Sequence, residues 1–157
     1  MILDVTWSIS AKLPGMARLG VNAVIVADDG RVLLTLRDRP PIWNLPGGGV
    51  EEGEAPWDAA VREVAEEVGV AVTVERLTGV YHRPPDGDPV LVFRCRLLAG
   101  APATSPEARE VGWFTVEALP APIHPYEPER ILDALRPGPA AVLASQPGPS
   151  VRHLFPD

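Results

Sequence analysis

The sequence predicts an α/β domain in which a mixed β-sheet is covered by one helix on each face. Segments rich in β-branched residues come in pairs separated by turn residues, and a segment with helical periodicity follows each group of strands. The order along the chain is therefore two strands, a helix, further strands and a second helix. At 157 residues, the chain has the size of one domain, with a core expected at about 17–136.

The first two strands are expected at residues 18–27 and 31–37, which are rich in β-branched or alternating apolar residues. Asp28-Asp29-Gly30 between them is a turn signal, so we predict a hairpin. Arg37 and Arg39 stand next to Pro40-Pro41, where strand pairing must stop or reach a sheet edge. Both arginines are candidates for contacting substrate phosphate, although surface arginines are the commoner explanation.

A helix is predicted at about Pro56 to Val68, because proline suits a first helical turn and Gly69 suits a stop. Its apolar positions follow i, i+3, i+4, i+7 spacing and its glutamates fall on the other side. Arg62 lies four residues before Glu66 and can pair with it. The expected apolar stripe is Val61, Val64, Ala65 and Val68, and the expected acidic group is Glu63, Glu66 and Glu67.

Three carboxylates within about one helical turn repel one another, and a bound cation would remove that repulsion. Oxygen ligands without histidine or cysteine favour Mg²⁺, or Mn²⁺, over zinc or copper. Taken alone, such a group is more often the solvated face of an ordinary amphipathic helix. The segment before the helix changes that balance, since Leu45-Pro46-Gly47-Gly48-Gly49 allows the backbone to approach a ligand closely.

This stretch resembles the Nudix box, G-x₅-E-x₇-R-E-U-x-E-E-x-G-U with U apolar, at every defined position. The matching residues are Gly48, Glu54, Arg62, Glu63, Val64, Glu66, Glu67, Gly69 and Val70. The resemblance implies a Nudix-type α/β/α sandwich and hydrolysis of a nucleoside diphosphate linked to another moiety. It also implies metal binding by Glu63, Glu66 and Glu67, with the Gly48 carbonyl as a further ligand and Arg62 and Glu54 in support. The general base stays open among the three glutamates.

The second half of the chain predicts two strands at 72–83 and 89–98, a strand at 111–114 and a helix at 128–135. Tyr81, at the end of the first of these strands, is a candidate for contacting a base or sugar, with packing as the commoner alternative. Residues 106–114 resemble the segment where many Nudix enzymes place another acidic residue above the metal. Glu107 is the first choice for that residue and Glu110 the second, with a solvated acidic loop as the alternative.

Composition limits the partners. The net charge of −7 argues against a nucleic acid polymer, which needs Lys and Arg to replace counterions. The single cysteine, Cys95, and the lack of a secretory or membrane-spanning pattern indicate a cytoplasmic protein. Residues 1–16 and the Pro- and Gly-rich tail at 137–157 lie outside the resemblance. The tail is expected to be partly flexible or to wrap a neighbour, and both segments are compatible with a homodimer.

We therefore predict a magnesium-dependent pyrophosphohydrolase acting on ADP-ribose, a nucleotide-sugar or a CDP-alcohol. One alternative is a MutT-type nucleoside triphosphate pyrophosphatase that removes oxidised nucleotides. An alternative of another class is a nucleotide-sensing module without turnover, against which the complete set of carboxylates and the lack of a basic recognition helix weigh.

Overall fold

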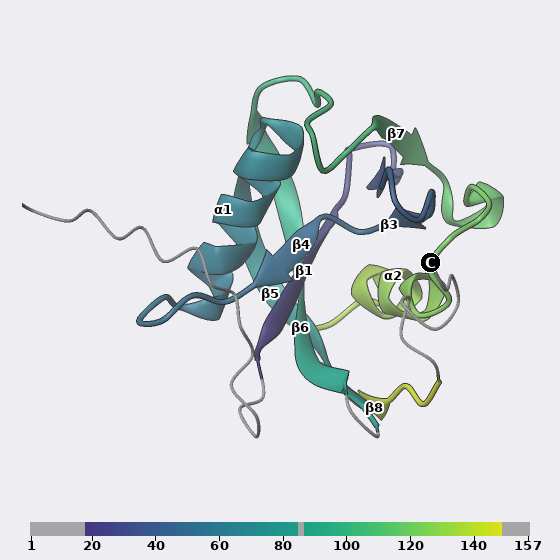
Figure 1. The fold of residues 1–157 in the computed structure, drawn as a ribbon. Helices are drawn as coiled ribbons and strands as arrows, with labels where there is room; N and C mark the ends of the chain where they lie inside the picture. The colour runs from purple at the N-terminus through teal and green to yellow at the C-terminus, as the bar shows by residue number, and fades with distance from the viewer. Residues whose placement is uncertain (1–17, 85–86, 149–157) are drawn as a thin grey trace, which may run out of the picture.

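The computed structural model describes residues 18–84 and 87–148, which form a layered α/β fold (Figure 1). Two α-helices and a short 3₁₀ helix, η1, accompany the strands. The elements in chain order are β1 Gly20–Ile25, β2 Val32–Leu36, β3 Trp43–Asn44, β4 Gly47–Gly49, α1 Pro56–Val68, β5 Ala71–Arg83, β6 Gly87–Ala99, β7 Glu110–Phe114, η1 Val116–Ala118, α2 Glu127–Leu135 and β8 Val142–Ser145.

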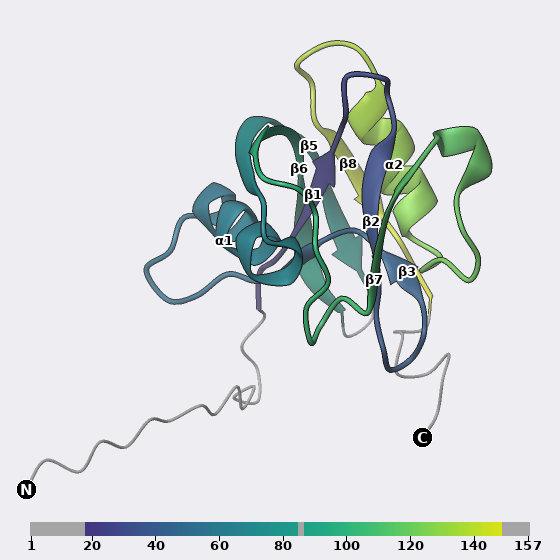
Figure 2. The same cartoon turned by 90° about the horizontal axis from the view of Figure 1, so that it is seen from above.

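The strands form two sheets. The larger is mixed and has the order β4-β1-β6-β5-β8, and the smaller is antiparallel and has the order β3-β2-β7. Figures 1 and 2 show α1 on one side of the larger sheet and α2 on the other, next to the smaller sheet. The predicted α/β/α sandwich is confirmed by this arrangement, with the strands divided between two sheets.

The hydrophobic core consists of two clusters, and successive side chains of β1 alternate between them. Val21, Ala23 and Ile25 belong to the cluster that packs against α1, whereas Val24 belongs to the cluster that packs against α2. This is the two-residue period of a strand buried on both faces. Asn22, on the same side as Val24, directs its side chain to α2 and accepts a hydrogen bond there.

The helix α1 begins and ends as predicted. Gly69 closes it in the left-handed region at φ 70°, where a side chain would be strained, and its N–H bonds the carbonyl of Ala65. The predicted apolar and acidic faces of α1 were wrong at two positions: Ala65, expected in the apolar stripe, is exposed, and Glu67, expected in the acidic group, is buried. Glu67 is buried because α1 packs against β4, where it finds a backbone donor.

The predicted hairpin at residues 18–37 was also wrong in its pairing. The strands exist, but they meet only in one antiparallel bridge between Val26 and Val32 before diverging into different sheets. β1 then pairs in parallel with β6, and β2 pairs with β7. The turn residues predicted the reversal of the chain correctly, while long-range pairing decided which strands became neighbours.

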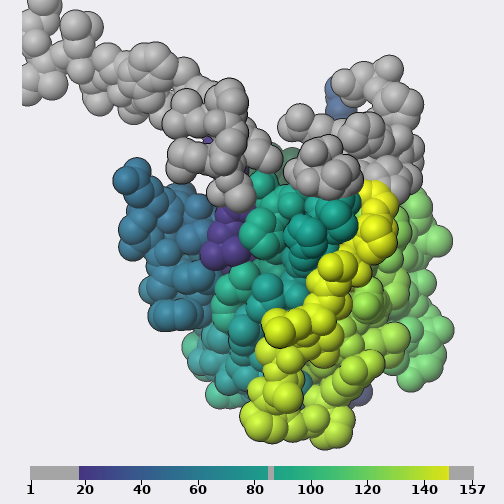
Figure 3. Space-filling model, turned by 90° about the horizontal axis from the view of Figure 1, so that it is seen from below, coloured from purple at the N-terminus to yellow at the C-terminus, as the bar shows by residue number. Residues whose placement is uncertain are grey.

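The first part of the tail predicted at 137–157 forms a strand against the larger sheet, and the partial flexibility of the tail stays a prediction. β8 pairs in parallel with β5 from Gly79–Val142 to His82–Ser145 and forms an edge of the larger sheet. Figure 3 shows this segment in yellow along the surface beside the teal strands. Residues 1–16 lie outside the described residues, so the predicted homodimer stays a prediction. Among the described helices, none is long and apolar enough to cross a membrane.

Candidate active site

The glycine strand β4 brings the backbone against two glutamates of α1. The N–H of Gly47 donates to Oε1 of Glu67 at 3.3 Å. The carboxylate of Glu63 lies against Gly48, where a Cβ atom would come within 2.3 Å of Oε1. A side chain at residue 48 would therefore displace the carboxylate of Glu63 from this position.

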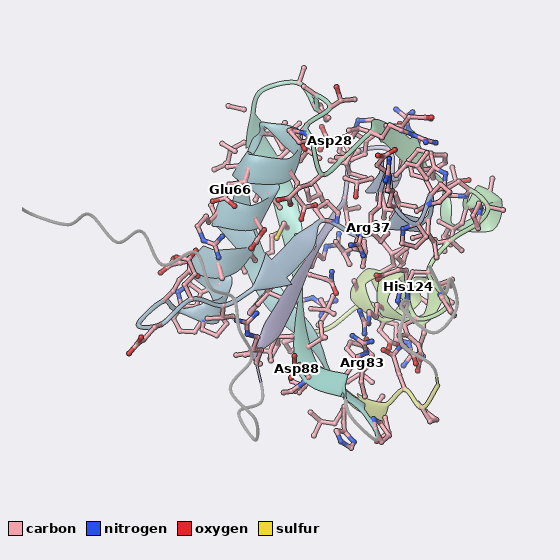
Figure 4. The ribbon with its side chains drawn as sticks, in the orientation of Figure 1. Asp28, Arg37, Glu66, Arg83, Asp88 and His124 are labelled. Carbon is pink, nitrogen blue, oxygen red and sulfur yellow. The ribbon has the colours of Figure 1, made fainter. Side chains whose placement is uncertain are left out.

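Three carboxylates converge beside this strand. Within the described residues, Glu63, Glu67 and Glu107 each offer an oxygen atom, and these atoms lie within 4.8 Å of one another. Two of the predicted metal ligands and the predicted supporting residue Glu107 thus meet, although Glu107 is forty residues further along the chain. The structure leaves Glu66 outside this group, with its side chain 59% exposed. Figure 4 shows Glu66 on the side of α1 that faces away from Arg37 and His124.

Burial and the charges of neighbouring carboxylates raise the pKa of Glu63 and of Glu67, so these two groups are hard to ionise. Burial is the main cause that raises the pKa of Glu67 to about 8, and the charges of Glu63 and Glu107 raise it further. Burial also raises the pKa of Glu63, while Arg62 opposes that shift. A divalent cation would favour the ionised form of both groups. The donor set is therefore suited to a hard cation with oxygen ligands, as predicted.

Arg62 holds the surrounding carboxylates in place. Its Nε and Nη2 atoms donate to the two oxygens of Glu54 at 2.7 and 3.0 Å. Its Nη1 atom donates to Glu63 at 3.0 Å and to Glu66 at 3.3 Å, so the predicted Arg62–Glu66 pair is present. A further bond joins Nη2 to the carbonyl of Gly49 at 3.0 Å. Hydrogen bonding to Arg62 is the main reason that the pKa of Glu54 falls to about 2.

A cleft of about 1070 Å³ opens between the glycine strand and α2. Arg37 and Arg39 line it, and their predicted contact with substrate stays a prediction. Burial is the main cause of the pKa shifts of Glu67, which is raised, and of His124, which is lowered, and the charge of Arg37 lowers both by a smaller amount. Tyr81 requires a correction, because its side chain is fully buried and its hydroxyl donates to Asp133 at 2.8 Å. This ring packs in the core, and Tyr81 is not among the residues that line the cleft.

On the α2 side the cleft has a polar floor that the motifs did not predict. Glu127 and Arg130 line the cleft, yet each is only 3% exposed. Arg130 donates through Nη1 to Asn22 at 2.9 Å and through Nε to Gln146 at 3.0 Å. These partners come from β1 and from the residue after β8. One signal existed in the sequence: Glu127 and Arg130 share the helical face of the buried Ile131 and Ala134.

Comparison with known proteins gives consistent matches. The NUDIX domain family matches residues 16–135. A "MutT-like protein" of Streptomyces ambofaciens is 36% identical over 99% of both chains. A Bacillus subtilis protein provisionally named an 8-oxo-dGTP diphosphatase is 33% identical over 73% of this chain and 77% of its own.

The fold is likewise similar to solved structures. The crystal structure of an ADP-ribose pyrophosphatase from Streptococcus suis superposes with a TM-score of 0.71 at 24% identity. That match covers 83% of this chain and all of the other.

Proposed function

Because this chain belongs to the Nudix family of hydrolases, which act on phosphorus-containing anhydrides, we propose that it hydrolyses a nucleoside diphosphate linked to another moiety. ADP-ribose, nucleotide-sugars and CDP-alcohols are the substrates of this class, and Mg²⁺ is the proposed cation. The observation that carries the proposal is the position of the carboxylate cluster beside a large cleft lined with arginines. A volume of about 1070 Å³ leaves room for two moieties joined through a pyrophosphate.

In this proposal the residues divide the work along the cleft. Glu63, Glu67 and Glu107 would hold the cation, with the Gly48 carbonyl and Glu66 as the further ligands expected from the motif. A bound divalent cation neutralises phosphate charge and lowers the pKa of a bound water. A glutamate among Glu63, Glu66 and Glu67 accepts the proton of the attacking water, an effect worth about 10²–10⁴ in rate.

Two sets of arginines serve different ends of this site. Arg62, fixed by Glu54, orients Glu63 and Glu66. Arg37 and Arg39 line the cleft and supply positive charge for the phosphates. The two roles are separable, because Arg62 is engaged by carboxylates whereas Arg37 and Arg39 border the space that the substrate would occupy.

A second candidate function is removal of oxidised nucleoside triphosphates. The similarity to the Bacillus subtilis protein, 33% identical over 73% of this chain, favours it. The two candidates share the same cluster and the same cleavage chemistry. They differ in whether the group beyond the pyrophosphate is a phosphate or a larger alcohol or sugar.

The test is a panel of nucleoside diphosphate derivatives and of canonical and oxidised triphosphates, assayed for product with Mg²⁺ and with chelator. We expect Mg²⁺-dependent release of a nucleoside monophosphate from the diphosphate derivatives. Turnover of oxidised triphosphates alone would replace the first candidate with the second. Metal-dependent nucleotide binding without any product would refute both and favour a nucleotide sensor.

A further inference from the structure

Glu127 and Arg130 form a buried ion pair at the floor of the cleft, and each has a polar atom that is not used in a hydrogen bond within the described residues. Nη1 of Arg130 lies 3.8 Å from Oε2 of Glu127, too far for a hydrogen bond. Among the described residues, neither Oε2 of Glu127 nor Nη2 of Arg130 has a hydrogen-bond partner. Both side chains are only 4% exposed, and both residues line the cleft. A buried acceptor and a buried donor left without partners cost free energy, which a ligand placed between them would recover.

The rest of the network fixes this pair in place. Leu45 donates its backbone N–H to Glu127. Asn22 and Gln146 accept from Arg130, whose guanidinium also stands over the rings of Tyr81 and Tyr126 at 5.3 and 5.6 Å. The free oxygen and the free nitrogen are therefore held in a preorganised arrangement, the condition under which a site selects its ligand.

Two further unpartnered atoms border the same space. Nε of Arg83 and Oδ1 of Asn44 are buried and have no hydrogen-bond partner within the described part of the chain, and both residues line the cleft. The floor thus offers two donors and two acceptors. Figure 4 shows Arg83 and His124 on the α2 side of β1, across that strand from α1.

The chemistry of the floor distinguishes among the parts of a nucleotide. A phosphate group has only acceptors at neutral pH, and the carboxylate of Glu127 would repel it. A nucleobase offers a donor next to an acceptor on one edge and two apolar faces. The apolar residues Leu45 and Val90, which belong to the core cluster on the α2 side, line the cleft beside the polar floor, and this suits a flat ring better than a ring of hydroxyl groups.

We propose that Glu127 and Arg130 bind the donor and acceptor edge of the substrate's nucleobase, and so determine base specificity. This inference rests on the proposed function, since it assumes a nucleotide in the cleft. The chain geometry allows one nucleotide to occupy the carboxylate cluster and the floor of the cleft together. Leu45, which donates to Glu127, is two residues from Gly47, which donates to Glu67, a separation of roughly 7 Å in an extended chain.

The test is calorimetric binding of the nucleoside 5′-monophosphates of the four common bases and of ribose 5-phosphate, with Mg²⁺. We expect the wild-type protein to bind at least one nucleoside monophosphate about tenfold or more tightly than ribose 5-phosphate, which has no base. Equal affinities for all five compounds would overturn the proposal. This comparison needs no variant, so it does not depend on the folding of one.

The Glu127→Gln variant keeps the shape of the side chain but replaces the free acceptor with an amide that can donate. We expect about tenfold weaker binding of the preferred nucleotide, a changed order of preference among the bases and unchanged binding of ribose 5-phosphate. The exposed Glu117→Gln variant on η1 is the matched control and should bind as the wild type does. Equal loss for the preferred nucleotide and ribose 5-phosphate would overturn the proposal, because the damage would then be general.

These results are separable from those of the substrate panel. If the protein discriminates among bases in binding but releases no product, the proposal of a base site stands and the proposed hydrolase function fails. If the protein hydrolyses compounds of the panel without discriminating among bases, the proposed function stands and the proposal of a base site fails.

Discussion

The two helices each bury one glutamate against the same short stretch of backbone, yet the two carboxylates meet opposite surroundings. Glu67 of α1 accepts from Gly47 and faces Glu63 and Glu107. Glu127 of α2 accepts from Leu45 and faces Arg130. Glu67 has excess negative charge around it, which a bound cation would neutralise. Glu127 already has a cation beside it, the guanidinium of Arg130. The α1 side is therefore suited to metal chemistry, and the α2 side to recognition and stability.

The strongest test of this contrast is the Glu67→Gln variant. We expect turnover to fall by about 10²–10⁴, because a cation ligand, and in one assignment the general base, is lost. The fold should not suffer, since removing a buried carboxylate that two others repel costs little. Steady-state kinetics with Mg²⁺, beside urea unfolding in chelator, measure the two effects separately.

Glu66→Gln is the matched comparison on the same helix. Its side chain lies at the surface, so we expect a smaller loss of turnover than for Glu67→Gln, although the motif predicts a loss for both. Near-normal turnover in both variants would contradict the assignment of the metal site. A drop in stability of Glu67→Gln as large as that of a core mutation would instead break the contrast between the two helices.

On the α2 side the largest effect should be on stability. Arg130→Met leaves the buried carboxylate of Glu127 without its cation and Asn22 and Gln146 without their donor. We expect a loss of about 3 kcal/mol in the free energy of unfolding, the usual cost of breaking a buried pair. Urea denaturation near pH 7.5, which is above the pKa of about 7 for Glu127, measures it.

The control for Arg130→Met is Arg109→Met, which removes a half-exposed arginine 3.5 Å from Asp38. Exposed pairs contribute little, so its effect should stay within about 0.5 kcal/mol. If the two variants lost the same amount of stability, the floor of the cleft would not be the structural centre of the α2 side.

Arg62→Lys tests the support of the metal cluster with a smaller expected effect. Lysine keeps the charge but cannot donate two parallel bonds to Glu54 while also reaching Glu63. We expect the Mg²⁺ concentration for half-maximal activity to rise about 10- to 100-fold. Arg94→Lys, which changes the pair with Glu75 elsewhere on the sheet, should leave that concentration unchanged. An unchanged Mg²⁺ requirement in Arg62→Lys would remove Arg62 from the support of the cluster.

The two sides also differ in how far the sequence predicted them. Glu63, Glu67, Arg62 and Gly48 lie within 20 residues, so a fixed spacing and a helix with clear ends place them together. Glu107 needed a loose resemblance, since only tertiary folding brings it to α1. The floor joins Asn22, Arg130 and Gln146 from three distant segments. No local spacing encodes that contact, and the pairing of β8 with β5 that positions Gln146 was not predicted either.

The smallest expected effect concerns pH, and it tests whether Glu127 is a buried titrating group. Burial is the main cause that raises its pKa to about 7 in the folded protein, against about 4.5 in an exposed chain. The folded state therefore binds more protons between pH 4.5 and 7, and this contribution to stability falls as pH rises through that window. Burial lowers the pKa of the neighbouring His124 from 6.5 to about 4. Its contribution has the opposite sign and rises between pH 4 and 6.5.

In the wild-type protein these two contributions oppose each other between pH 4.5 and 6.5. Glu67, whose pKa is raised to about 8, adds a second falling contribution that both proteins share. Glu127→Gln removes one of the two falling contributions, so the slope of the unfolding free energy against pH should become more positive than in the wild type by about 1 kcal/mol per pH unit. Urea unfolding at pH 4.5, 5.5 and 6.5 gives both slopes. Parallel slopes would mean that Glu127 does not titrate there. Glu127 would then stay ionised beside Arg130 from pH 4.5 to 6.5. It would differ from Glu67 only in being paired with an arginine.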